Sequence, residues 1–358
     1  MTAYLVLQNG MVMEGNSFGS QGEITGEVVF ATGMTGYLET LTDPSYHGQI
    51  VLQTFPLIGN YGVIPSDFES ANVGARAYIV KHPCENPSNF RSENDLDSFL
   101  KERKIIGLYG IDTRALTKII RQNGVMNGKI MMSPPTKSDI EEIKAYTILN
   151  AVAAVSSREV TKVFPESKAQ DHSRVVKRVA LIDYGAKRGI AKALAARGCE
   201  VWTFPHNTSA QEILKMKPDG IMLTNGPGDP SEKANDILIE TLRDLQKSKV
   251  TIFGICLGHQ LLALANGYKT KKLKFGHRGA NQPVKDISTG RVYITSQNHG
   301  YAVVADNGSF VNVNDGTCEG LDYGNSFSVQ FRPEACGGPL DMSFLFDRFI
   351  ERMNNNVA

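Results

Sequence analysis

The strongest constraint on this chain is a short segment in which one cysteine stands at a sharp turn between two apolar runs. Residues 250–253 form an apolar, largely β-branched run typical of a buried strand, and residues 261–265 predict a helix. Between them lies GICLGHQ, residues 254–260, with glycines on both sides of Cys256. Strand, turn and helix in this order form a nucleophile elbow with Cys in place of Ser. Because the helix dipole favours a thiolate at a helix N-terminus, the segment predicts a nucleophilic Cys256.

The size and charge of the chain exclude several classes of protein. A length of 358 residues indicates two or three domains, and 41% hydrophobic residues suffice for sizeable cores. The 38 basic and 37 acidic residues nearly cancel, so charge gives no case for binding nucleic acid or a membrane surface. No apolar run approaches the roughly 20 residues that span a bilayer. The start, MTAYLVL, lacks a basic region and predicts a strand instead of a signal peptide.

The cysteines are scattered, and no two have the spacing of metal ligands. They are Cys84, Cys199, Cys256, Cys318 and Cys336. An odd number of cysteines without a pairing pattern fits a reducing compartment better than a disulfide framework. We therefore expect no metal site and a cytoplasmic location.

The chain changes character near residue 165. Residues 1–165 hold short β-like runs, Gly/Pro turns, a helix over 112–122 capped by Asp112 or Thr113, and a second helix near 138, which predicts a mixed β/α domain. Residues 166–176 are polar without apolar periodicity and predict a linker. From residue 177 to 358, strands and helices alternate.

This alternation predicts an α/β domain with a largely parallel sheet and helices on both faces. Strands are expected over 178–182, 200–204 and 220–223, with helices over 188–196, 210–215 and 234–247. In such sheets the site lies at the carboxyl ends of the strands, which is where Cys256 falls.

Three further segments follow predicted strands of this domain. The run TNGPGDP, residues 224–230, is either a plain tight turn or a glycine loop whose N–H groups help Leu257 to form an oxyanion hole. The run SQNHGY, residues 296–301, is either a polar loop or a wall for a ligand with amide or amino-acid ends. Arg332 and Glu334 follow an expected strand over 327–331 and project to one side if the segment is extended.

Together these motifs resemble the class I, triad-type glutamine amidotransferases. The rest of the chain resembles the family of small, glutamine-hydrolysing subunits of carbamoyl-phosphate synthase. The supporting runs are GMTGY at 33–37, DPSY at 43–46, PLIGNYG at 56–62, GIDTR at 110–114, KFGHRGAN at 274–281, TSQNHGYAV at 295–303 and NDGT at 314–317. The resemblance covers essentially the whole chain and implies a small-subunit domain, which docks on the large subunit, before the amidotransferase domain.

The resemblance implies roles for matching positions. Cys256 is the expected nucleophile, Glu334 the expected orienting acid, and position 332 the expected site of the base. Gly226 and Leu257 are expected to present the oxyanion-hole backbone. The residues expected to hold glutamine are Ser45, Gly228, Gln260, Asn298, Gly300 and Tyr301, together with Gly226 and Leu257.

The resemblance also implies a partner. A large subunit is expected to form a heterodimer, or a higher oligomer, with this chain and to receive its ammonia for carbamoyl phosphate synthesis, which serves arginine or pyrimidine formation. ATP, Mg²⁺ and bicarbonate are expected on that partner. No cofactor is expected on this chain, which contains no P-loop motif.

The chain departs from the family pattern at two positions. Arg332 stands where histidine is expected, and Gln282 stands where histidine usually follows Gly-Ala-Asn. A guanidinium stays protonated and has no acceptor, so Arg332 cannot take the thiol proton, although its charge can stabilise a thiolate or simply pair with Glu334.

Two mechanisms follow from Arg332. Either glutaminase activity is weak and the complex uses free ammonia, or His299 or His259 partly replaces the base. Two other functions stay open: a non-catalytic scaffold for ammonia-dependent synthesis, and a glutaminase of another synthetase, such as anthranilate or GMP synthase.

Overall fold

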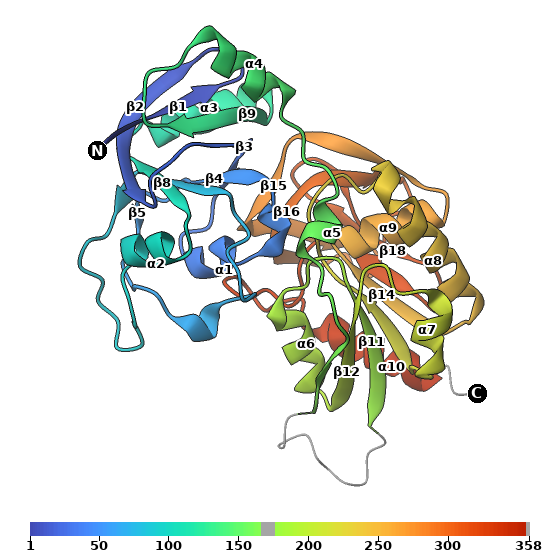
Figure 1. Cartoon of the computed structure of the whole chain (residues 1–358). Coiled ribbons are helices and arrows are strands. Elements are labelled where there is room, and N and C mark those ends of the chain that lie inside the picture. The colour runs from blue at the N-terminus through green and yellow to red at the C-terminus, as the bar shows by residue number, and fades with distance from the viewer. Residues whose placement is uncertain (166–175, 356–358) are drawn as a thin grey trace. The chain divides into compact units, whose positions relative to one another are not determined.

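The computed structural model describes residues 1–165 and 176–355. It divides into two compact units (Figure 1). The first comprises Met1–Leu149 and Leu273–Gly279, and the second comprises Asn150–Lys272 and the described residues from Ala280 onward. Among the described residues, no helix is both long and apolar enough to cross a membrane.

The division falls earlier in the chain than residue 165. Residues 150–165 belong to the second unit because they pack on its sheet: Val163 of strand β10 (Thr161–Val163) pairs with Val201, and Val152 lies in the same apolar cluster as Ile182. Ten of the eleven residues of the predicted linker, 166–175, lie outside the described residues.

The first unit is built around a closed barrel of mixed strands. In spatial order these are β1 (Thr2–Leu7), β2 (Val12–Gly19), β8 (Ile106–Tyr109), β6 (Ala77–Val80), β4 (Gln49–Gln53), β3 (Ile24–Ala31) and β9 (Met126–Met131). The run β3–β4–β6–β8 is parallel, and β1, β2 and β9 pair antiparallel. The sequence indicated mixed strands here but not that they close.

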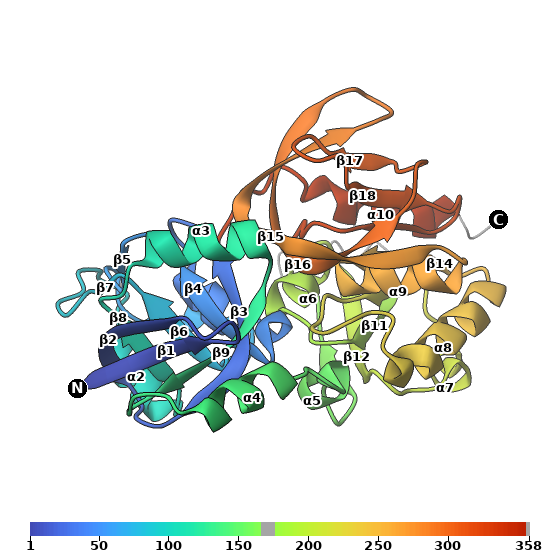
Figure 2. The ribbon, with the colours of Figure 1, turned by 90° about the horizontal axis from the view of Figure 1, so that it is seen from above.

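Helices cover the barrel on separate sides. They are α1 (Tyr37–Leu41), α2 (Leu96–Glu102), α3 (Thr113–Asn123) and α4 (Lys137–Ala145). Figure 2 shows α3 and α4 separated by barrel strands. Successive residues of a strand point to opposite faces of the sheet and so enter different apolar clusters. Ile50 packs in the cluster that includes α3, and its neighbour Val51 packs in the cluster that includes α1 and α2. The predicted helix start is confirmed, because the Asp112 side chain caps α3 at the Ala115 N–H, 2.9 Å away.

The remaining elements of this unit are short. They are the 3₁₀ turns η1 (Pro44–Tyr46) and η2 (Pro65–Asp67) and the paired strands β5 (Leu57–Ile58) and β7 (His82–Pro83).

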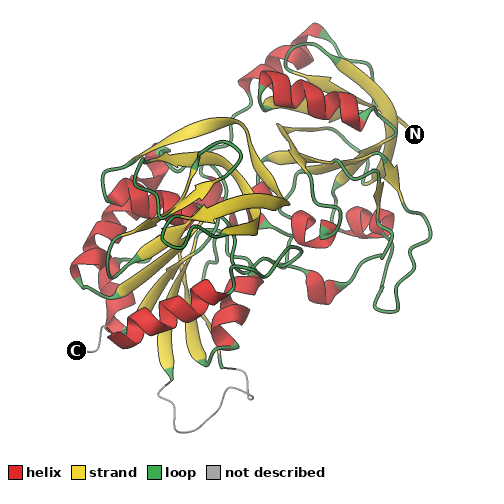
Figure 3. Ribbon diagram, turned by 180° about the vertical axis from the view of Figure 1, so that it is seen from behind, coloured by secondary structure: helices red, strands yellow, loops and turns green. Residues whose placement is uncertain are grey.

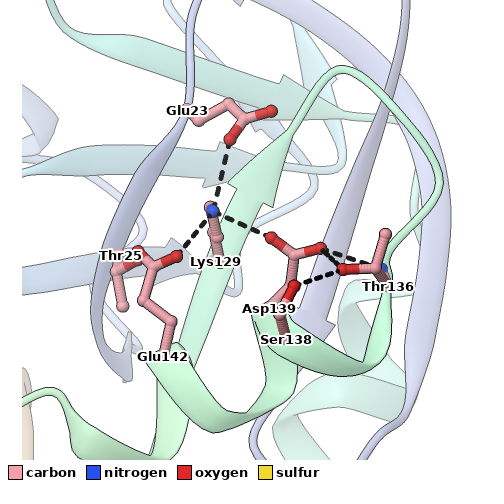
Figure 4. A network of polar contacts seen from close by, with 7 residues as sticks. All are labelled: Glu23, Thr25, Lys129, Thr136, Ser138, Asp139 and Glu142. Atoms are coloured by element: carbon pink, nitrogen blue, oxygen red, sulfur yellow. Dashed lines mark hydrogen bonds and ion pairs between the residues drawn. The ribbon is translucent and has the colours of Figure 1, made fainter.

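A buried lysine fastens α4 to the barrel (Figure 4). Lys129 on β9 contacts Glu142 at 3.0 Å, Asp139 at 3.1 Å and Glu23 at 3.2 Å, and its side chain is 9% exposed. Burial disfavours the ammonium, but hydrogen bonds to three carboxylates outweigh this and raise the pKa of Lys129 above its ordinary value. Without this cation, three carboxylates would face one another.

We expect Lys129→Met to destabilise the chain by about 2 kcal/mol, because the carboxylates lose their common counter-charge and only two of them can turn to solvent. The midpoint of urea denaturation measures the loss. The matched control is Lys144→Met on α4, which removes an exposed pair with Glu141 and should cost less than about 0.5 kcal/mol. Equal losses for both variants would contradict this role of Lys129.

The second unit is built on one large sheet. In spatial order its strands are β10, β12 (Cys199–Pro205), β11 (Lys177–Asp183), β13 (Gly220–Leu223), β14 (Thr251–Ile255), β19 (Phe327–Val329), β18 (Cys318–Asp322), β17 (Phe310–Asn312), β15 (Lys269–Asp286) and β16 (Val292–Val304). The run from β12 to β19 is parallel, which confirms the predicted largely parallel sheet.

Helices lie on both faces of this sheet. They are α5 (Ala151–Val155), α6 (Arg188–Ala195), α7 (Ala210–Lys215), the turn η4 (Lys233–Asn235), α8 (Asp236–Lys247), α9 (Leu257–Ala265) and α10 (Phe344–Asn355). Leu181 on β11 packs in the cluster of α6 and α10, and its neighbour Ile182 in that of α7, α8 and α9. Figure 3 shows α10 lying across the strands. The helices predicted near 188, 210 and 234 are confirmed.

Candidate active site

The nucleophile elbow predicted at Cys256 is present between β14 and α9. Cys256 has φ 55° and ψ −103°, a region that side chains rarely adopt. Its N–H donates to the Val329 carbonyl at 2.9 Å, and the residue is 2% exposed. Such a conformation costs about 1–3 kcal/mol and persists only where the surroundings enforce it.

Two glycines let α9 press against the strands. A Cβ on Gly258 would lie 2.6 Å from the Leu223 carbonyl oxygen, and one on Gly254 would lie 2.8 Å from the Gly258 carbonyl oxygen. Both distances are shorter than real Cβ contacts. The Gly258 N–H donates to the Thr224 carbonyl at 3.0 Å, which ties the start of α9 to the end of β13. The glycines around Cys256 are therefore required by close approach of backbone.

The glycine loop after β13 meets the elbow. A Cβ on Gly226 would lie 2.6 Å from Leu257 Cδ2 and 2.3 Å from the Tyr184 carbonyl oxygen. The two residues predicted for the oxyanion hole, Gly226 and Leu257, thus lie side by side. Gly228 has φ +91°, a backbone conformation that glycine favours. A Cβ added to it would lie 2.9 Å from the Ala151 Cβ.

The polar run on β16 also meets α9. Gln260 donates from Nε2 to the Tyr301 carbonyl at 2.7 Å and to Gln330 Oε1 at 2.9 Å. Gly300 lies between Asn298 and Tyr301 on the same strand. Five of the predicted glutamine-binding residues, counting Leu257 at the start of α9, therefore come from two elements that contact each other.

The Asn298 carbonyl connects the nucleophile with Arg332. The Cys256 thiol lies 3.5 Å from this oxygen, and the Arg332 Nη2 donates to it at 3.3 Å. Arg332 is 4% exposed, and its own N–H donates to the Ser296 carbonyl. The structure thus brings the guanidinium and the thiol to one carbonyl oxygen, with Arg332 at the position where the family pattern has the base.

Arg332 and Glu334 do not lie on an extended segment as expected. Strand β19 ends at Val329, and the Ala335 N–H donates back to the Arg332 carbonyl at 3.2 Å in a turn. Pro333 favours this turn because its ring fixes φ and it has no N–H for a ladder. Glu334 consequently forms its ion pair with Lys187, 3.1 Å away. Its second oxygen, Oε2, is buried and accepts no hydrogen bond.

Lys187 is a site residue that the motifs did not reveal. It precedes α6, its N–H donates to Asn225 Oδ1 at 3.2 Å, and its side chain is 4% exposed against 0% for Glu334. One signal was available in the sequence. Lys187 follows a predicted strand at the carboxyl edge of a parallel sheet, where ligand sites gather.

The two histidines considered as substitute bases are both buried and engaged. His259 on α9 contacts Ser328 Oγ through Nδ1 at 2.8 Å, and burial lowers the pKa of His259 to about 3. His299 contacts the Tyr301 carbonyl at 2.7 Å and Gln297 Oε1 at 2.9 Å.

The last predicted residue, Ser45, belongs to the first unit. It lies on η1, is buried, and its N–H donates to Asp43 Oδ1 at 2.9 Å. Gln282, the second departure, accepts hydrogen bonds from the Thr295 hydroxyl through its carbonyl at 2.9 Å and from Asn312 Nδ2 through its side-chain oxygen at 3.5 Å.

Comparison with known proteins identifies the family. The model described as carbamoyl-phosphate synthase small chain, CPSase domain, matches residues 5–130, and that of glutamine amidotransferase class-I matches residues 180–352. A carbamoyl phosphate synthase small chain from Clostridium perfringens is 48% identical over 98% of this chain and 99% of its own length. The chain belongs to the carbamoyl phosphate synthase small chain family.

Other small chains agree over the same extent. One from Fusobacterium nucleatum is 48% identical over 99% of this chain and 98% of its own length. One from Halalkalibacterium halodurans, named pyrimidine-specific, is 49% identical over 99% and 98%. The predicted identity as the small, glutamine-hydrolysing subunit is confirmed, as is the fold class. A small chain implies a large-subunit partner. The match over residues 5–130 to the small-chain domain argues against the alternative that the chain is the glutaminase of another synthetase.

The pairing of Lys187 with Glu334 in this small chain can be tested by measuring whether their contributions to stability are coupled. We expect Lys187→Met to lower stability by about 3–5 kcal/mol, because it leaves a fully buried carboxylate without its cation. The double variant Lys187→Met/Glu334→Gln should recover at least half of that loss. Denaturant midpoints of the two single variants and the double variant measure the coupling, and additive losses would contradict the pairing.

Proposed function

We propose that this small chain hydrolyses glutamine poorly and that its complex with the large subunit draws mainly on free ammonia. The observation that carries the proposal is that Arg332 is buried and donates to the same carbonyl oxygen that the Cys256 thiol contacts. The heterodimer, ATP and Mg²⁺ on the partner, and a cytoplasmic location are part of the same proposal.

Glutamine hydrolysis through a thioester needs a proton acceptor twice. The Cys256 thiol must lose its proton to attack the side-chain amide carbon, and the departing nitrogen must gain one to leave as ammonia. Water must then lose a proton as it attacks the thioester and releases glutamate and the thiol. General acid–base help of this kind is worth roughly 10²–10⁴-fold in rate.

Arg332 supplies charge but no proton transfer. A guanidinium has five N–H donors and no acceptor, and it stays protonated at accessible pH. It can favour a Cys256 thiolate, which assists attack, but neither ammonia departure nor water attack gains from it. Because members of a triad act as a unit, the loss of one exceeds its separate contribution.

The contacts of the two histidines argue against a substitute base. With its pKa lowered to about 3, His259 holds a transferred proton poorly. Both ring nitrogens of His299 are already engaged, Nδ1 with the Tyr301 carbonyl and Nε2 with the Gln297 side-chain amide, so its ring is not directed at the thiol. These contacts favour impaired hydrolysis over a displaced base.

We expect Arg332→His to raise glutamine-dependent carbamoyl phosphate synthesis by roughly 10²-fold or more in the reconstituted complex, because it restores a proton acceptor beside the thiol. Ammonia-dependent synthesis should change less than about twofold, since ammonia bypasses Cys256. Both rates are measured by product formation at saturating glutamine or ammonium.

Two controls separate the base from other effects of the change. Arg332→Gln removes the charge and keeps a donor for the Asn298 carbonyl, but offers no base, and should leave glutamine turnover low. Adding Cys256→Ala to Arg332→His should abolish the gain. Rapid glutamine turnover by the unaltered complex would refute the proposal.

Covalent labelling of Cys256 tests the remaining alternative, that the chain is a scaffold whose thiol cannot react. Reaction of Cys256 with an electrophilic glutamine analogue, followed by mass spectrometry, would show a formed pocket and an accessible thiolate. Absence of labelling would favour the scaffold.

A further inference from the structure

We propose that Thr224 is a positioning residue for the oxyanion hole, because its buried hydroxyl fixes the peptide that joins Asn225 to Gly226. Thr224 acts through the direction of the Gly226 N–H and not by touching the substrate. The inference rests on glutamine hydrolysis at Cys256, and it gives a role to a residue for which the glycine-loop motif alone indicated none.

Thr224 directly follows β13 at the carboxyl edge of the parallel sheet. It is fully buried, at 0% exposed. Its N–H donates to the Ile182 carbonyl of β11 at 3.3 Å, and its carbonyl accepts from the Gly258 N–H at 3.0 Å. The backbone of this one residue is therefore bound to a neighbouring strand on one side and to the start of α9 on the other.

The Thr224 hydroxyl bridges two backbone groups. The Tyr184 N–H donates to Thr224 Oγ1 at 2.9 Å, so the hydroxyl oxygen is an acceptor in this bond. The Asn225 carbonyl oxygen lies 2.9 Å from the same Oγ1 and can only accept, so it takes the hydroxyl hydrogen. A hydroxyl has one hydrogen to give and lone pairs to receive, and these two bonds use both capacities.

Holding the Asn225 carbonyl also holds the Gly226 N–H. The peptide between these residues is trans, and in a planar trans peptide the carbonyl and the N–H point in opposite directions. Glycine offers little steric resistance to rotation of the peptide before it, because it has no Cβ. The hydroxyl bond therefore supplies an orientation that Gly226 itself does not impose.

The Asn225 side chain anchors the loop next to this peptide. Its Nδ2 donates to the Gly185 carbonyl at 2.8 Å, and its Oδ1 accepts from the Lys187 N–H at 3.2 Å. Asn225 is 0% exposed. The loop after β13 is thus bound to the loop after β11, and the Thr224 hydroxyl sets the rotation of the peptide that follows.

This peptide lies beside the elbow. A Cβ on Gly226 would lie 2.6 Å from Leu257 Cδ2, and the Leu257 N–H is the other expected donor of the oxyanion hole. The negative oxygen forms only after the thiol has attacked the amide carbon. A misdirected Gly226 N–H therefore weakens binding of the transition state more than binding of glutamine, so kcat falls while KM stays.

The kinetic test is Thr224→Val in the complex with the large subunit, made on the Arg332→His chain because its hydrolysis is expected to be measurable. We expect kcat for glutamine hydrolysis to fall by roughly 10- to 10²-fold, less than the loss of a whole oxyanion-hole donor, with KM unchanged. Thr224→Ser keeps the hydroxyl and should restore most of the loss. Ammonia-dependent synthesis should be the same in all these variants.

Thr251→Val is the matched control for loss of a buried threonine hydroxyl. Thr251 is also 0% exposed, and its hydroxyl donates to Asn325 Oδ1 at 3.0 Å. It begins β14, at the opposite end of the strand from Cys256. We expect this variant to leave kcat unchanged, and equal losses in the two valine variants would contradict a positioning role of Thr224.

A second measurement needs no turnover and uses the unaltered chain. With ¹³C at the asparagine carbonyls and ¹⁵N at the glycines, a coupled signal arises only where Gly follows Asn. The signal lost in Asn225→Ser identifies the peptide between Asn225 and Gly226. Because an accepted hydrogen bond deshields a carbonyl carbon, this resonance should move upfield in Thr224→Val and stay in place in Thr224→Ser.

An Asn225 carbonyl signal that stays in place in Thr224→Val would overturn the proposal. So would an unchanged kcat in that variant when the host chain hydrolyses glutamine. Rapid turnover by the chain that keeps Arg332 would instead refute the proposed function, and Thr224→Val is then measured in that chain. Where neither host turns over, the carbonyl signal decides.

Discussion

The active region depends on one close contact, the approach of α9 to the end of β13. Gly258 has room for no side chain against the Leu223 backbone, and this contact sets the start of the helix. Cys256 must then turn with a positive φ to join β14 to the helix. The strain in one residue is maintained by the packing of buried strands and a helix on both sides of it. Every candidate role around the thiol presupposes this turn.

A single backbone oxygen organises the chemistry around that turn. The Asn298 carbonyl accepts from the Cys256 thiol and from Arg332, so the guanidinium is tied to the place where a proton acceptor is needed. Backbone atoms keep this arrangement whatever the side chain at 298. A histidine at 332 would enter a site in which the Cys256 thiol, the Gly226 loop beside Leu257 and the amide groups of β16 already lie together.

Buried charges distinguish this protein more than its overall charge does. Lys129 anchors α4 in the first unit, and in the second unit Lys187 pairs with Glu334 close to the site. Glu319 lies in the interior with amide donors. Removing one member of such a group leaves the rest unpaired in a medium that solvates charge poorly, so their effects are coupled. A net charge of +1 gives no indication of them.

Local periodicity, glycines and capping groups were sufficient to predict the elbow at Cys256, the parallel α/β order of the second unit and a helix start at Asp112 or Thr113. Three features became visible in the folded chain alone: the strands of the first unit close into a barrel, Pro333 lies in a turn that starts at Arg332, and Glu334 meets Lys187, 147 residues away. The physical reason is that ion pairs and shared carbonyls join distant segments, whose meeting depends on how the whole sheet is assembled.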